Sequence, residues 1–410
     1  MSLATLIEAV ERFAAAAYPL TEHQLNQPSY RWADYEQVRY AFLHTTLELR
    51  QLAAGLLQMR YRGGQYPTYA HHLLARHQQM YRECLALLTG ISDEDGLRPP
   101  APHEWPVQRI ILHIYQTERY FYAAIRNALN SYINQTPAPP LPDEPEKIYA
   151  LAEETGTPET EEIPLSDLKK RWATLHSRIV YNLSDLKDLR LNLVAPMWES
   201  TAYPVRFRMH RLETHLQEHT NQLEKTLIAL GWLTEPRLLL RQMYNALGEV
   251  EGAIIGTGIM GYSECMNAAA IIHDRVAELQ TAVRQSEAIL TAVKEQNLAA
   301  AQDLLTANPA LVNSSDSDGL FLITKAAYNQ DWAMVNLLLE AGAFLDLHEA
   351  AAAGSLKHAQ AWLQHSPNDL HTLSRDGYTP LQLSRRFNHE EVIHYLLEQG
   401  AEDTNREQTP

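Results

Sequence analysis

Cysteine and long apolar stretches are nearly absent from this sequence, and glycine is less frequent than proline. The only two cysteines, Cys84 and Cys265, lie far apart in segments with helical patterning. Their positions exclude a disulfide framework and a cysteine-based zinc knuckle, and fit a reducing compartment. With 17 glycines against 21 prolines, a glycine-rich β architecture is disfavoured. No apolar run is long enough to span a membrane, and the N-terminal residues lack a basic region ahead of an apolar stretch. We therefore expect a cytoplasmic protein.

Basic residues are also scarce relative to acidic ones. The 34 Lys and Arg residues face 50 Asp and Glu residues, a net charge of −16. Phosphate backbones and anionic lipids repel such a chain unless a basic face is locally concentrated, and no basic run occurs. We expect neither a nucleic-acid partner nor a membrane partner. The length of 410 residues indicates two or three domains.

Apolar residues recur at helical spacing through most of the chain, which predicts an all-α fold. A proline- and glutamate-rich segment, 136–164, is expected to be an exposed acidic loop. The four helices from residue 69 onward can form an antiparallel bundle. The predicted helices before the C-terminal region span 3–17, 35–60, 69–88, 105–133, 165–186 and 204–230, with two more within 237–287.

The C-terminal segment 376–402 reads DGYTPLQLSRRFNHEEVIHYLLEQGAE. Gly377 suits a turn, Thr379 caps a helix that starts with Pro380, and Gly400 ends the next helix. The segment resembles the ankyrin consensus at the turn, the helix start and the second helix. An earlier copy, 318–344, repeats the DG and LLLEAGA motifs.

Two further, weaker repeats complete the predicted array. A degenerate unit, 348–374, lies between the two clear copies, and 287–316 looks like a capping unit. About four repeats satisfy the minimum of about three for a continuous core. The ankyrin resemblance implies a protein partner, although repeats that only support the helical domain stay an alternative.

Two histidines, His215 and His219, lie four residues apart on the predicted helix 204–230. This spacing lets both imidazoles reach one metal ion. They lie on the shoulder of that helix's apolar stripe, facing a neighbouring helix, although a solvated polar flank would look similar. With 18 histidines in the chain, the spacing alone is a weak signal.

The sequences EWPVQRIILHIYQTERYF (104–121) and PVRFRMHRLETHLQEHTNQLEKTLIALG (204–231) strengthen that signal. Over about residues 69–232 the chain resembles the DinB-like family of metal-binding four-helix bundles, which includes thiol-dependent S-transferases and maleylpyruvate isomerases. The family takes one histidine from the second bundle helix and two from the fourth. The resemblance therefore implies His113, His215 and His219 as ligands, with a divalent transition metal (zinc, nickel or iron) and a low-molecular-weight thiol as cofactors.

The third ligand is the least certain part of this set. His113 lies far from the apolar stripe of its own helix, so periodicity does not place it in the core. His210 and His176 are alternatives. Gln222 and Glu218 are candidates for orienting the ligands or the substrate. The alternative is that these are surface or interface histidines in a bundle that has lost its metal.

Two other signals have simpler explanations. The segment AIIGTGIMG (253–261) contains the GxGxxG of a dinucleotide-binding turn, but it follows a helical pattern and lacks a second strand. We interpret it as the break of a helical hairpin. Neither cysteine has a basic residue or histidine one helical turn away, so both are expected to be buried packing residues.

Two functions remain open, a metal-dependent enzyme and a non-catalytic adaptor. The enzyme would activate a thiol or water to attack a small-molecule electrophile, and no catalytic residue beyond the metal ligands is identifiable. The chain is also compatible with a homodimer. The expected organisation is an N-terminal helical extension (1–65), a DinB-like bundle (66–233), a helical hairpin connector (234–286) and ankyrin repeats (287–405).

Overall fold

The computed structural model describes residues 2–28, 37–154, 162–199, 201, 203–258 and 260–402. Regular structure in these residues is helical, which confirms the all-α prediction. Two isolated β-bridges, Val194 with Pro204 and Ser315 with Phe321, are the β pairing found in the described part of the chain. Among the same residues, no helix combines the length and the apolar character that crossing a membrane requires.

The chain divides into two compact units, and each is made from two stretches of sequence. The bundle unit contains Met1–Leu20 and Phe42–Val276, and the repeat unit contains Thr21–Ala41 and Ala277–Pro410. The N-terminal stretch expected as one extension therefore contributes to both units. Part of the helix predicted over 35–60 lies outside the described residues, and the observed helix there is α3, Tyr40–Arg62.

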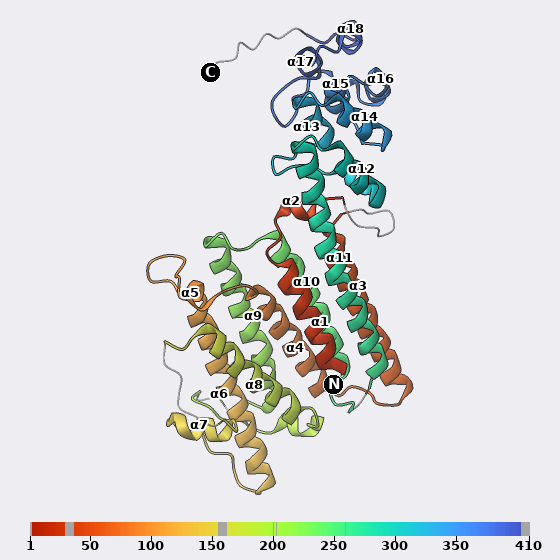
Figure 1. Ribbon diagram of the computed structural model, residues 1–410. Helices are drawn as coiled ribbons and strands as arrows, with labels where there is room; N and C mark the ends of the chain where they lie inside the picture. The colour runs from red at the N-terminus through yellow and green to blue at the C-terminus, as the bar shows by residue number, and fades with distance from the viewer. Residues whose placement is uncertain are drawn as a thin grey trace. The chain divides into compact units, whose positions relative to one another are not determined.

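Four helices of the bundle unit surround one hydrophobic core (Figure 1). α9 packs against α4 and α6, and α8 contacts α6 and α4, so the four helices close into a ring. Trp172 and Tyr122 are among the largest fully buried side chains of this core. The bounds are α4 (Tyr69–Leu87), α6 (Val107–Ile133), α8 (Leu165–Leu183) and α9 (Val205–Ala229).

A further group of helices covers this bundle. α10 packs closely on α4, and α1 packs on α10. The close approach of α10 needs glycine, because a Cβ added at Gly248 would lie 2.7 Å from the Cα of Gln79, and one at Gly252 would lie 2.8 Å from the Cβ of Ala75. The remaining helices of this unit are α1 (Ser2–Ala17), α5 (Asp93–Gly96), α7 (Pro145–Leu151), α10 (Glu235–Ala253) and the first part of α11 (Tyr262–Lys294).

The segment expected to be an exposed acidic loop is partly helical and partly buried. α7 begins with Pro145 in its first turn, where a proline favours helix formation. Its Ile148 and Tyr149 are buried against the bundle. Glu154 accepts a hydrogen bond from Tyr115 (3.0 Å) and pairs with Arg119, so an acidic residue of this segment is anchored on α6. The prediction of an exposed loop is wrong for this part.

The GxGxxG segment joins α10 to α11 and is preceded by helix. Gly256 has φ +75°, a left-handed conformation that favours glycine, and a Cβ there would lie 2.4 Å from Nε2 of His71. The segment is therefore the helix-hairpin break that we expected.

The repeat unit consists of successive helix pairs, as the repeat pattern predicts. Thr379 caps α17 through a capping box with Gln382, and Gly377 (φ +86°) and Gly400 (φ +95°) take the left-handed conformation at the turn and after the last helix. Residues 403–405 of the expected array lie outside the described part. The helices are α2 (Glu22–Leu25), the rest of α11, α12 (Leu298–Ala307), α13 (Leu322–Tyr328), α14 (Trp332–Glu340), α15 (Leu347–Ala353), α16 (Leu356–His365), α17 (Pro380–Arg386) and α18 (Glu390–Glu398), with 3-10 turns at Pro309–Asn313 and Pro367–His371.

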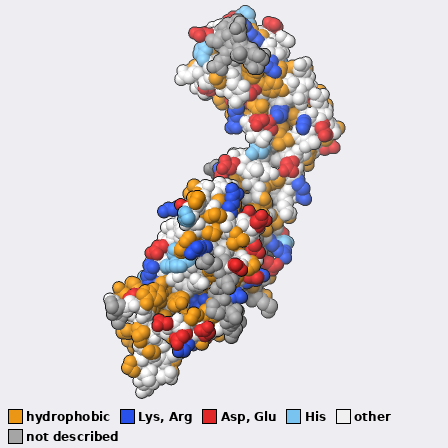
Figure 2. Space-filling view, turned by 90° about the vertical axis from the view of Figure 1, so that its left-hand side faces the viewer, with side chains coloured by type: hydrophobic (Ala, Val, Ile, Leu, Met, Phe, Trp, Pro, Cys, Tyr) orange, Lys and Arg blue, Asp and Glu red, His pale blue; other side chains and the backbone are white. Residues whose placement is uncertain are grey.

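Charge is mixed on the molecular surface. On the face drawn in Figure 2, acidic and basic side chains of the described residues are interspersed. This distribution agrees with a chain in which the basic residues are dispersed along the sequence.

The glycine contact between α10 and α4 gives the first prediction. Gly248→Ala should destabilise the protein by about 1 to 3 kcal/mol, because the added methyl group meets backbone rather than a movable side chain. Gly55→Ala in α3 is the matched control, since nothing lies within 4 Å of that Cβ. It should stabilise by up to about 1 kcal/mol through helix propensity. Thermal and urea unfolding followed by circular dichroism measure both changes. Equal effects of the two variants would show that α10 does not need this close approach.

Candidate metal centre

The contact between α6 and α9 brings three histidines together. His113 comes from α6, and His215 and His219 come from successive turns of α9. A ligand atom from each ring lies within 4.8 Å of the others, and the Nε2 atoms of His113 and His215 are 3.2 Å apart. The structure thus places His113, despite its position off the apolar stripe, beside the two α9 histidines.

Aromatic side chains border the cluster. Trp105 packs edge-on against His113 with ring centroids 5.4 Å apart, and Phe121 packs against His215 at 5.8 Å. Arg211 lies over the Phe121 ring at 5.9 Å and pairs with Glu218. These contacts limit the orientations of the imidazole rings and leave one cationic side chain beside them.

Burial keeps two histidines of the cluster, His113 and His215, neutral. His215 is 7% exposed, and burial, together with His219, His113 and Arg211, lowers its pKa to about 3. Burial, and then His219, also lowers the pKa of His113. Both imidazoles are therefore uncharged at neutral pH, which is the form that ligates metals.

Gln222 fixes the orientation of His219. The Nδ1 of His219 donates a hydrogen bond of 2.7 Å to Oε1 of Gln222, which leaves Nε2 of that ring as an acceptor. Gln222 therefore makes the contact expected of an orienting partner. Glu218, the other candidate, pairs with Arg211 at 3.1 Å instead.

The two alternative ligands lie elsewhere. His210 forms a hydrogen bond of 3.0 Å with the hydroxyl of Tyr69. His176 is buried in α8, where Tyr81 stacks on its ring at 3.7 Å. The structure brings neither of them to His215 and His219.

His176 belongs instead to a second cluster, with His77 and Glu118, that the sequence did not indicate. All three are buried. Glu118 accepts hydrogen bonds from Nε2 of His77 (2.7 Å) and from the indole of Trp172 (2.8 Å). The four residues come from three helices, so no local motif could reveal them. Because its carboxylate already accepts two donors, we interpret this cluster as a hydrogen-bonded part of the core.

The cysteines take no part in either cluster. Burial raises the pKa of Cys84 to about 12, and burial also raises the pKa of Cys265. Both side chains are buried, so the thiols are protonated packing groups, as predicted.

A cavity of about 1150 Å³ lies in another part of the bundle unit, between α1, α4, α8 and α10. None of the three clustered histidines of α6 and α9 lines it, whereas His176 does. The histidine cluster and this cavity are therefore separate features.

Two family models match the chain. Residues 76–223 match the DinB superfamily, and this range includes all three histidines of the α6–α9 cluster. Residues 347–404 match ankyrin repeats, over the last two of the helix pairs described above. The chain therefore contains a DinB superfamily domain followed by ankyrin repeats.

The neutral state of His176 gives a prediction about pH. Burial, His77 and Arg82 lower its pKa well below the usual value of 6.5, so the unfolded chain binds a proton below pH 6.5 that the folded chain does not. This group therefore lowers stability as the pH falls below 6.5. The variant His176→Phe lacks this pH-dependent loss of stability. The decrease that the substitution causes in the free energy of unfolding, relative to wild type, should therefore be smaller at pH 5 than at pH 7. Urea unfolding at both values, with a chelator present, tests this. An equal difference in unfolding free energy between wild type and variant at both pH values would contradict a neutral His176.

Proposed function

We propose that the DinB superfamily domain of this chain binds one divalent transition ion through His113, His215 and His219. An ion held by these three histidines would supply Lewis-acid chemistry that favours the nucleophilic form of a low-molecular-weight thiol or a water molecule, and the reaction class we propose is attack of that nucleophile on a small electrophile. The observation that carries the proposal is the convergence of the three imidazoles between α6 and α9. The ankyrin repeats bind a protein partner.

The spacing of the nitrogens fits a metal. Zinc–nitrogen bonds of about 2.0 to 2.1 Å in a tetrahedral site separate two ligand nitrogens by about 3.3 Å. The Nε2 atoms of His113 and His215 are 3.2 Å apart. Small side-chain movements bring His219 to the same distance, since the whole set lies within 4.8 Å.

The protonation states also fit. Two neutral imidazoles with facing Nε2 atoms share at most one proton, so at least one lone pair points into the cluster. Gln222 holds the proton of His219 on Nδ1, which directs its Nε2 lone pair away from the amide. A neutral imidazole ring binds a metal cation directly, whereas an imidazolium must first release a proton.

Three histidine ligands leave a coordination position open for a reactant. A zinc, nickel or ferrous ion held by His113, His215 and His219 would lower the pKa of a bound thiol or water and so supply a nucleophile at neutral pH. Trp105 and Phe121 reduce access of bulk water to the rings. Arg211 lies over Phe121 and is paired with Glu218, so it borders the cluster with a compensated charge.

Ankyrin repeats are protein-interaction modules, and this array presents apolar side chains that a partner could cover. Phe344 is 54% exposed and Leu373 is 54% exposed. Stacked repeats of this kind form an extended concave surface that binds partners. The partner surface is therefore assigned to the repeat unit, separately from the metal chemistry.

The metal assignment is tested by stoichiometry. Wild-type protein should bind close to one zinc or nickel ion per chain, and His215→Ala combined with His219→Ala should bind none. His113→Ala should lose at least about tenfold in affinity, since removing even an outer partner of a ligand costs that much. His210→Ala is the matched control, because it removes a histidine of α9 that contacts Tyr69. Metal retention by the double variant, or loss in the control, would contradict the ligand set.

Activity and the role of Gln222 are tested together. Metal-loaded protein should accelerate the conjugation of glutathione with monobromobimane, and the double histidine variant should not. Gln222→Ala should weaken metal binding by about 10- to 100-fold, because His219 loses its orienting acceptor, whereas Gln222→Asn is the conservative comparison. Protein that binds metal normally yet accelerates neither thiol conjugation nor ester hydrolysis would favour the adaptor function.

A further inference from the structure

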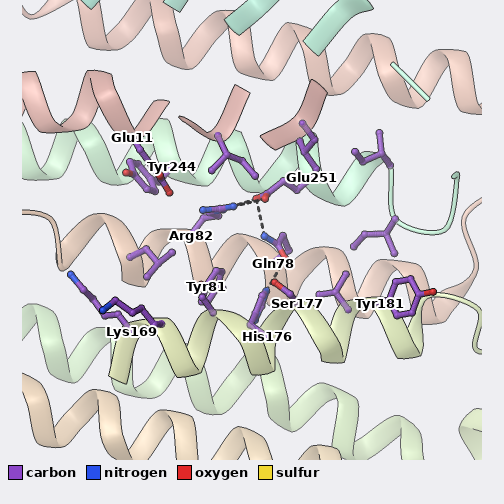
Figure 3. A pocket seen from close by; sticks show the side chains of 18 of the residues that line it. Glu11, Gln78, Tyr81, Arg82, Lys169, His176, Ser177, Tyr181, Tyr244 and Glu251 are labelled. Atoms are coloured by element: carbon purple, nitrogen blue, oxygen red, sulfur yellow. Dashed lines mark hydrogen bonds and ion pairs between the residues drawn. The ribbon is translucent and has the colours of Figure 1, made fainter. Parts of the chain in front are cut away.

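The cavity between α1, α4, α8 and α10 has a polar wall and an apolar wall. In Figure 3, α4 lies between α8 on one side and α10 on the other, and Lys169, His176 and Tyr181 follow one another along α8. These three residues span about 18 Å at the rise of an α-helix. The volume of about 1150 Å³ reaches the upper end of small-molecule sites.

The polar wall is a chain of buried side chains that satisfy most of their hydrogen bonds with one another. Glu251 of α10 accepts two hydrogen bonds from Arg82 (2.7 and 2.5 Å) and one from Gln78 (2.8 Å). Gln78 in turn accepts from Nε2 of His176 at 2.7 Å. His176 is 2% exposed, and its buried Nδ1 has no hydrogen-bond partner among the described residues. Since Nε2 carries the proton, Nδ1 is an acceptor that stays buried behind this wall of the cavity.

One end of the cavity carries an unpaired positive charge. Lys169 is half-buried, and within the described chain it has no ion pair or hydrogen bond. Burial lowers its pKa, and the nearby Asp93 only partly opposes this. The carboxylate of Asp93 itself accepts hydrogen bonds from the backbone amide (2.7 Å) and the hydroxyl (2.9 Å) of Ser166. Lys170 lines the same end and pairs with the exposed Asp167.

The rest of the lining supplies apolar contacts. Leu85 of α4 and Ala173 and Val180 of α8 line the cavity and are only partly buried, although they pack against the bundle core. A ligand that covers them removes apolar surface from water, at about 25 cal/mol per Å². An acidic group at Lys169 also gives this ammonium a direct ion pair, in addition to the more distant charge of Asp93.

We propose that this cavity binds a small amphipathic anion, with its acidic group at Lys169 and its apolar body along Leu85, Ala173 and Val180. This site is distinct from the histidine cluster of α6 and α9 and does not depend on a metal there. Lys169 favours an acidic group at its own end of the cavity, while the carboxylates of Glu11 and Asp185 also line the cavity, so the apolar body of the ligand lies along the α8 wall, whose length suits an elongated molecule.

Calorimetric titration of the metal-free full-length chain with dodecanoate, below its micellar concentration, tests the proposal. Saturable binding of one dodecanoate per chain is expected, and dodecanol should bind at least about tenfold more weakly. Lys169→Ala should weaken dodecanoate about tenfold without changing dodecanol binding, and Lys169→Arg should retain most of the affinity. Lys147→Ala is the matched control, because Lys147 pairs with Glu144 on the surface and does not line the cavity.

Cavity-filling variants locate the site. Ala173→Trp and Val180→Trp should each abolish dodecanoate binding while far-ultraviolet circular dichroism stays unchanged. If one of them fails to fold, the other decides. The proposal is overturned if wild type shows no saturable binding, if dodecanol binds as tightly as dodecanoate, if Lys169→Ala binds like wild type, or if a folded cavity-filling variant keeps full affinity. None of these outcomes depends on the metal content of the histidine cluster.

Discussion

The bundle unit depends on one helix, α4, that is packed on opposite sides by α9 and α10. Such a helix must bury polar side chains as well as apolar ones, and Arg82 and Gln78 find their partner in Glu251 of α10. Removing one member of a buried ion pair costs several kcal/mol, because the other charge is left uncompensated. The glycines of α10 allow the close approach that makes these bonds. The same chain of bonds continues to His176 and so defines the polar wall of the cavity.

A similar constraint on α6 produces two histidine clusters rather than one. His113 and Glu118 are five residues apart, so they project about 140° from each other around the helix. His113 meets the histidines of α9, and Glu118 meets His77 of α4 and Trp172 of α8. Because several neighbours cover α6, it has no single inward face. The position of the apolar stripe on α6 therefore did not predict that His113 lies beside the α9 histidines. The family resemblance suggested that residue instead.

The three imidazoles and the cavity suit different chemistry. The α6–α9 cluster consists of neutral nitrogen donors with aromatic neighbours, a composition that suits a soft or borderline metal ion. The cavity offers a half-buried ammonium beside apolar side chains, a composition that suits an organic anion. Both lie in the bundle unit. The proposed metal site, the proposed anion site and the ankyrin repeats therefore use different residues of the chain.

Local sequence determined most of the helices and their ends. Periodicity located α4, α6, α8 and α9, and the capping box of Thr379 and the turn at Gly377 follow from residue chemistry that acts within a few positions. The spacing of His215 and His219 is likewise a local property of one helix. The buried helix α7 was missed, because a proline-rich, acidic composition concealed a short segment whose Ile148 and Tyr149 pack on α6.

Tertiary structure alone decided which distant residues meet. His176 lies apart from the α9 histidines, Glu251 pairs with Arg82, and Lys169 lies beside an apolar wall. Each of these arrangements depends on contacts between helices that are far apart in the chain. The division of the N-terminal stretch between two units has the same origin. Periodicity states which face of a helix is apolar, but burial depends on how many neighbours cover the helix, and that number is a property of the packed fold.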